Sequence, residues 1–182
     1  MMKGKYILIG GFAVGLAVAS ALSFSDGDRD WSMSATDVRP VTNPMYAAEC
    51  GSCHFAYQPG LLPARSWEKM MAGLDDHFGE NAELGPDVLA TLTDYLVANA
   101  AETDPGWVAK RIEASAPDGA ASLRISEQPY IVHKHDEIPR YMVRDNAEVG
   151  SLSNCMACHT RADKGVYDED TVRIPGYPYW ED

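Results

Sequence analysis

All four cysteines of this 182-residue chain lie in two copies of one five-residue pattern. The first copy, CGSCH, occupies residues 50–54, and the second, CMACH, occupies residues 155–159. Two thiols three positions apart, followed at once by an imidazole, suit the covalent attachment of one haem, because the thiols reach its two vinyl groups and the histidine faces its iron. The sequence therefore predicts two attachment sites and leaves no cysteine for another use.

Three other uses of paired cysteines explain the pattern less well. Structural disulfides and a four-cysteine zinc site give no reason for a histidine to follow both pairs. A thioredoxin-like redox pair belongs to a βαβ context and would not occur twice. We therefore expect two covalently bound haem c groups, with thioether bonds from Cys50, Cys53, Cys155 and Cys158. His54 and His159 would each supply one axial ligand to iron.

The start of the chain is typical of an exported protein. Lys3 and Lys5 precede an apolar run that ends in a small-residue triplet, so we predict a signal peptide over residues 1–21. The alternative is an uncleaved anchor over residues 6–24, because that stretch approaches the roughly 20 residues needed to span a membrane. Both interpretations place the remainder in the periplasm, either soluble or tethered to the inner membrane.

Composition and charge limit the partners of the chain. Hydrophobic residues make up 46% and charged residues 23%, which is typical of a soluble globular protein with a packed core. The net charge of -12 repels nucleic acid and anionic lipid and attracts basic proteins. We predict no nucleic-acid partner, and contact with a membrane only if the leader is retained.

His77 is the candidate for the second ligand of the first haem. Residues 66–79 have helical spacing of apolar positions, with a serine cap at the start and a glycine at the end, and His77 falls on the apolar stripe. A thioether from Met70 or Met71, or an open site, are the alternatives.

His135 and His133 compete for the second haem. Residues 129–138 read as a short helix with proline at its first position, and residues two apart point to different sides of a helix. His135 shares the apolar side, whereas His133 lies on the opposite face, so His135 is favoured and His133 is the lesser alternative.

Turn and helix signals divide the chain into four segments. After the leader, polar residues 22–42 read as a flexible arm. Residues 43–116 form the predicted N-terminal haem lobe, with helices starting at an Asn-Pro pair at 43–44, spanning about 86–98, and running from about 104 to 114. A turn at 117–119 opens the C-terminal haem lobe, residues 117–182, which ends in a non-helical aromatic tail. The expected fold class is mainly α, with two small c-type haem lobes, short helices and extensive loops.

Several stretches beyond the motifs resemble the bacterial dihaem cytochrome c family, DHC. After the first motif come Ala-Tyr at 56–57, Pro-Gly-Leu-Leu-Pro-Ala at 59–64, Ser-Trp at 66–67 and His-Phe-Gly-Glu at 77–80. His-Asp-Glu-Ile at 135–138 and an asparagine at 154, just before the second motif, continue the likeness, which covers about residues 45–175.

The resemblance implies a periplasmic electron carrier with two low-spin haems, each held by two histidines. His54 and His77 would hold one iron, and His159 and His135 the other. Family members look like donors to a small high-spin monohaem cytochrome c, and a membrane b-type cytochrome would reduce them.

Two imidazoles at each iron leave no coordination position open, so we expect outer-sphere transfer of single electrons and no catalytic residue. One alternative is a membrane-anchored subunit of a redox complex, held by residues 6–24. The other is a dihaem peroxidase-type enzyme, which needs one open or switchable iron.

Overall fold

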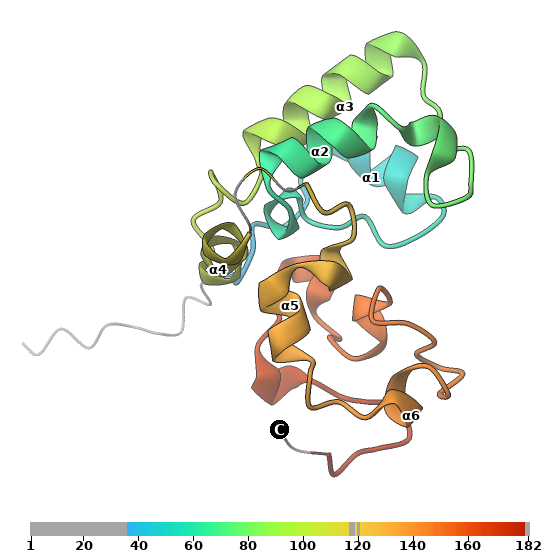
Figure 1. Cartoon of the computed structure of the whole chain (residues 1–182), viewed down its shortest axis with the longest axis vertical. Helices are drawn as coiled ribbons and strands as arrows, with labels where there is room; N and C mark the ends of the chain where they lie inside the picture. Colours follow the sequence, from blue (N-terminus) through green and yellow to red (C-terminus); the bar gives the residue numbers. More distant parts are fainter. Residues whose placement is uncertain (1–35, 117–118, 120, 181–182) are drawn as a thin grey trace, which may run out of the picture. The chain divides into compact units, whose positions relative to one another are not determined.

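The computed structural model describes residues 36–116, 119 and 121–180 (Figure 1). The predicted signal peptide at 1–21, the alternative anchor at 6–24 and the first part of the predicted arm, 22–35, lie outside these residues. Six α-helices and several short 3-10 turns form the described part, which contains no β-strand. The mainly α fold class is confirmed, and no helix in the described part is long and apolar enough to cross a membrane.

Three helices pack together in the N-terminal half: α1 (Pro44–Gly51), α2 (Ala64–Met71) and α3 (Pro86–Ala98) (Figure 1). The first begins where the Asn43 side chain accepts hydrogen bonds from the backbone N–H groups of residues 45 and 46, at 2.9 and 3.1 Å. Both α1 and α3 have proline at their first position, as the sequence predicts. Their shared core consists of Tyr46, Leu62, Trp67, Met71, Leu92, Leu96 and Ala100.

The helix predicted over residues 66–79 is wrong in its extent. Helix α2 ends at Met71, and a separate 3-10 turn spans Leu74–Asp76 before the chain reaches His77. His77 then opens a tight turn closed by two backbone hydrogen bonds with Glu80, of 2.7 and 3.3 Å. Phe78 and Gly79 have φ angles of 58° and 98°, so the turn needs two successive residues in the left-handed region. His77 is therefore positioned by this turn and not by a helix.

Three further helices follow: α4 (Trp107–Ser115), α5 (Pro129–Lys134) and α6 (Arg140–Val143) (Figure 1). The helix predicted from about 104 to 114 corresponds to α4. Helix α5 starts at the expected proline but stops at Lys134, so the segment to residue 138 is not helical. The second CxxCH motif lies on a 3-10 turn, Cys155–Ala157, instead of an α-helix.

A second core cluster joins the two predicted lobes. Its buried members are Val38, Leu61, Ala101, Val108 and Ile112, and partly buried side chains from α5 and from the segment after the second motif pack against them. The described residues before and after 117–118 therefore share one core and belong to one compact unit.

The structure differs from the predicted flexible arm over residues 36–42. Asp37 and Val38 are buried, and the Val38 backbone N–H donates to the Gly165 carbonyl at 3.1 Å. The carboxylate of Asp37 accepts hydrogen bonds from the Trp107 indole and from the Tyr167 backbone N–H. Hydrogen bonds therefore tie this segment to residues of both halves.

Candidate haem sites

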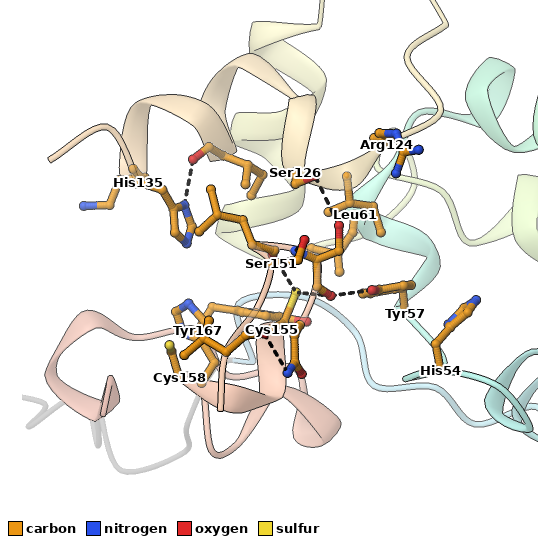
Figure 2. Close-up of a pocket in the computed structure, with 18 of the residues that line it drawn as sticks. His54, Tyr57, Leu61, Arg124, Ser126, His135, Ser151, Cys155, Cys158 and Tyr167 are labelled. Atoms are coloured by element: carbon orange, nitrogen blue, oxygen red, sulfur yellow. Dashed lines mark hydrogen bonds between the residues drawn. The ribbon is translucent and has the colours of Figure 1, made fainter. Parts of the chain in front are cut away.

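One open cavity of about 1840 Å³ contains both CxxCH motifs. A single drug-sized ligand needs roughly 300 to 1,000 Å³, so the space suits two large ligands. The walls include all of the following candidate residues: Cys50, Cys53, His54, His77, His135, Cys155, Cys158 and His159. Figure 2 shows part of this cavity.

The first candidate site is built from the end of α1 and the turn after α2. Cys50 lies in the last turn of α1, and Cys53 and His54 follow directly. The Nδ1 atom of His54 lies 2.7 Å from the Phe55 carbonyl oxygen, so Nε2 is the nitrogen left to face iron. The His54 and His77 rings face each other with centroids 6.1 Å apart and planes only 18° from parallel.

The second candidate site is built from the end of α5 and the 3-10 turn at 155–157. His135 follows α5, and its Nδ1 lies 2.7 Å from the Ile131 carbonyl oxygen, which again leaves Nε2 free. The rings of His135 and His159 have centroids 6.0 Å apart and planes 69° apart. Nδ1 of His159 is buried without a hydrogen-bond partner.

Both ring separations match the space that one metal ion requires. A metal–imidazole bond is about 2.0 to 2.1 Å long, and each ring centroid lies about 1.1 Å beyond its nitrogen, so two imidazoles on opposite sides of one metal have centroids about 6.3 Å apart. The observed separations of 6.1 and 6.0 Å are close to this value. With a pair of thiols beside each pair of rings, the donor set fits two covalently attached haems.

The structure places the competing histidine away from the cavity. His133 lies on the outer side of α5, where its side chain is 78% exposed and its Nδ1 is 3.6 Å from an Asp136 carboxylate oxygen. His135 reaches the cavity because α5 ends one residue before it.

Burial favours the uncharged forms of His159 and His77 in the protein alone. Desolvation, with a smaller contribution from neighbouring His135, lowers the pKa of His159 to about 4. The pKa of His77 is also lowered, first by desolvation and then by His54 and Arg124. A neutral imidazole keeps its lone pair for a metal, so both rings suit ligation at neutral pH.

The thiols behave similarly. Desolvation raises the pKa of Cys50 to about 11, with a smaller contribution from Glu49, and burial raises the pKa of Cys155 to about 11 as well. The pKa of Cys158 is raised for the same reason. Thioether bonds remove these protons permanently and end the cost of burying an ionisable thiol.

Two tyrosines at the cavity and one buried glutamine were given no role by the sequence analysis. Tyr57 lies beside His54, with ring centroids 5.3 Å apart, and Tyr167 lies beside His159 at the same centroid distance. Gln58, the residue after Tyr57, is fully buried and accepts a hydrogen bond from the Tyr167 hydroxyl. The one local feature that could have pointed to them is the tyrosine three positions after the first motif. Its position in the sequence does not reveal that its contacts lie about a hundred residues away.

The fold and the paired sites define a c-type cytochrome with two haems. The family model described as dihaem cytochrome c, DHC, matches residues 46–167. The chain therefore belongs to the dihaem cytochrome c family, is an electron-transfer haem protein, and carries two covalent c-type haems.

Solved structures agree with this assignment. A dihaem cytochrome c from Shewanella baltica is 47% identical to this chain and has a TM-score of 0.63. The match covers 76% of this chain and 98% of the Shewanella chain. A dihaem cytochrome c from Rhodobacter sphaeroides is 43% identical, covers 71% and 99% of the two chains, and has a TM-score of 0.62. No curated protein sequence matches the chain significantly.

Proposed function

We propose that the protein is a periplasmic carrier that passes single electrons between redox partners through two bis-histidine haems. His54 and His77 are the proposed ligands of the first haem iron, and His159 and His135 those of the second. Cys50 with Cys53, and Cys155 with Cys158, are the proposed attachment pairs.

The observation that carries this proposal is the pair of imidazoles at each site. Ring centroids 6.1 and 6.0 Å apart leave room for one iron between two nitrogens and for no further ligand. A substrate would have to displace a histidine to reach either metal, whereas electron transfer needs no open position. This favours a carrier over a peroxidase-type enzyme.

The residues of the chain have three tasks in such a carrier. The carbonyl groups of Phe55 and Ile131 hold Nδ1 of His54 and His135, which fixes the orientation of each ring and keeps Nε2 toward the cavity. Apolar side chains from both cores exclude water from the haem faces. When bound, the two haems supply reversible one-electron iron chemistry, with potentials lowered relative to methionine-ligated haems.

Charge supports a basic redox partner. The chain has a net charge of -12, which attracts a basic protein over long range and loses that attraction as salt is added. The proposed partners are a high-spin monohaem cytochrome c as acceptor and a membrane b-type cytochrome as donor. Association rates with the acceptor should fall as ionic strength rises.

Spectroscopy of the reduced protein tests the proposed ligation. The wild type should show two low-spin haems and should not bind carbon monoxide, because no iron position is open. Ready binding of the gas, or turnover of peroxide, would instead favour the enzyme alternative. The mass of the purified protein should exceed that of the polypeptide by two haems.

The membrane-anchored alternative depends on residues 6–24, which lie outside the described part of the chain. Mass spectrometry of the mature N-terminus distinguishes it from a free carrier. Cleavage after Ala21 removes most of the anchor, and an intact leader retains it.

A further inference from the structure

Tyr57 connects the two candidate sites directly. Its ring lies against His54, with centroids 5.3 Å apart, and its hydroxyl donates a hydrogen bond to the Ser153 carbonyl oxygen at 2.5 Å (Figure 2). The same carbonyl oxygen lies 3.8 Å from Sγ of Cys155. A side chain from beside one haem motif thus reaches the backbone two residues before the other, across 96 positions of sequence.

The next residue makes a second connection. Gln58 is fully buried, its amide nitrogen donates to the Ala162 carbonyl oxygen at 2.5 Å, and its amide oxygen accepts from the Tyr167 hydroxyl at 2.6 Å. The Tyr167 ring in turn lies against His159, with centroids 5.3 Å apart. Both polar ends of this buried amide are therefore used, and both partners belong to the second site.

These contacts form two routes that start beside His54. One runs through the Tyr57 hydroxyl to Ser153 and Cys155, and the other runs through Gln58 and Tyr167 to His159. A buried polar group is costly unless it is hydrogen-bonded, so an amide that is bonded at both ends favours one arrangement of the two halves.

We propose that Tyr57, Gln58 and Tyr167 form the bridge that couples the two haem sites electronically and sets the rate at which an electron equilibrates between them. This inference rests on the proposed function, because it presumes that both sites hold a haem iron. One electron leaves the reduced iron of one site and reduces the oxidised iron of the other, and no bond forms or breaks.

The physical basis is the way electronic coupling decays with the material between two centres. Coupling falls more steeply across a gap than along covalent and hydrogen bonds, so a hydrogen-bonded chain is a better path than loosely packed side chains. The tyrosines keep their protons throughout, because burial raises the pKa of Tyr57 to about 12 and the pKa of Tyr167 well above its usual value. They therefore act as fixed hydrogen-bond donors and positioning residues.

Two conservative substitutions distinguish the electronic role of the bridging hydroxyls from the support that the tyrosine rings give to the histidines. Tyr57→Phe and Tyr167→Phe each delete one bridging hydroxyl and keep the ring against its histidine. Tyr141→Phe is the matched control, since Tyr141 contacts the ring of Tyr177 and lies outside the cavity wall. Each holoprotein is partly reduced by a flash-generated flavin semiquinone, and inter-haem equilibration is followed at wavelengths where the two haems differ.

The bridge predicts severalfold slower equilibration in each single variant, a still slower rate in the double variant, and the wild-type rate in Tyr141→Phe. Haem content, low-spin spectra and both midpoint potentials should stay at wild-type values, which a merely structural role would not leave unchanged. A wild-type rate in Tyr57→Phe and Tyr167→Phe alike would overturn the bridge and leave the carrier function intact. So would slower transfer that is accompanied by a shifted potential or a high-spin haem.

The proposed function fails by different observations from those that overturn the bridge. Carbon monoxide binding by the wild type, or the lack of two covalent haems, would contradict the carrier itself. If the double variant does not assemble, the two single variants carry the same comparison.

Discussion

The two candidate haem sites have the same ligand spacing but different surroundings. Their ring centroids are 6.1 and 6.0 Å apart, yet the rings are nearly parallel at the first site, 18°, and nearly perpendicular at the second, 69°. His54 is exposed in the protein alone, whereas His159 is more buried and its Nδ1 has no partner. The comparison teaches that the two pairs of rings share a spacing although different elements position their second histidines, and that these elements set the orientation and burial of the rings.

The largest expected effect is the loss of one haem at a time. C50S/C53S and C155S/C158S each remove one attachment pair, so the mass of each variant should show one haem instead of two. Because each site has its own histidine pair, the remaining haem should keep its low-spin spectrum. Loss of both haems from either double variant would contradict the independence of the two sites.

The next effect is a change of potential on exchanging a ligand. His77→Met and His135→Met should each raise the midpoint potential of one haem by on the order of 100 mV, since axial-ligand identity tunes haem potentials over roughly 0.8 V. Redox titration of each holoprotein measures this shift.

His133→Met is the matched control for the ligand exchange. Its side chain is 78% exposed and points away from the cavity, so both potentials should stay at their wild-type values. If the potential of one haem shifted in His133→Met and neither potential shifted in His135→Met, His133 would be the ligand and His135 would not.

The ring orientations predict two different paramagnetic-resonance signals in the oxidised wild type. Parallel imidazoles donate π electrons mainly to one iron d orbital and split it from its partner, which gives a well-resolved rhombic low-spin spectrum. Perpendicular imidazoles raise both orbitals equally, which gives a broad signal with one large g value. The first site should show the rhombic spectrum and the second the large-g signal.

The cysteine variants assign these signals to sites. C155S/C158S should retain the rhombic spectrum alone, and C50S/C53S the large-g signal alone. Identical signals in the two variants would show that the ring orientations do not differ once haem is bound.

Sequence patterns predicted what local chemistry determines. The Asn-Pro start of α1 and the proline start of α3 were correct because capping and proline geometry act within one turn. The interpretation of residues 66–79 was wrong because Leu74 and Phe78 continue the apolar spacing of α2 after the helix has ended. The spacing of apolar residues shows which side chains face the core. It does not show that the backbone is helical, because a turn can place side chains on the same side.

The connections between the halves were beyond prediction for a different reason. Asp37, Gln58 and Tyr167 meet through hydrogen bonds that span 109 to 130 positions. No spacing rule relates residues so far apart, and a polar segment such as 36–42 looks like a flexible arm until its partners are known. The identity of the second ligands also depended on family resemblance, because spacing alone left methionine and a second histidine as alternatives.

The smallest effect concerns a single charge beside the first site. The Arg124 guanidinium lies 4.1 Å from the centroid of the Phe78 ring, and Phe78 follows His77 directly. A nearby positive charge favours the reduced iron, so Arg124→Gln should lower the potential of the first haem and leave the second unchanged.

The size of that shift follows from the exposure of the charge. The Arg124 side chain is 46% exposed and is partly balanced by Glu127 at 3.6 Å, so its interaction with the site should resemble that of an exposed ion pair. Such pairs are worth about 0.2 to 1 kcal/mol, which corresponds to roughly 10 to 40 mV for a one-electron couple. Added salt should reduce the difference from wild type by screening.

Lys110→Gln makes the same charge change on the exposed side of α4, outside the cavity wall, and should leave both potentials in place. Equal shifts in both haems of Arg124→Gln would mean that the charge acts on the whole molecule and does not distinguish the two sites.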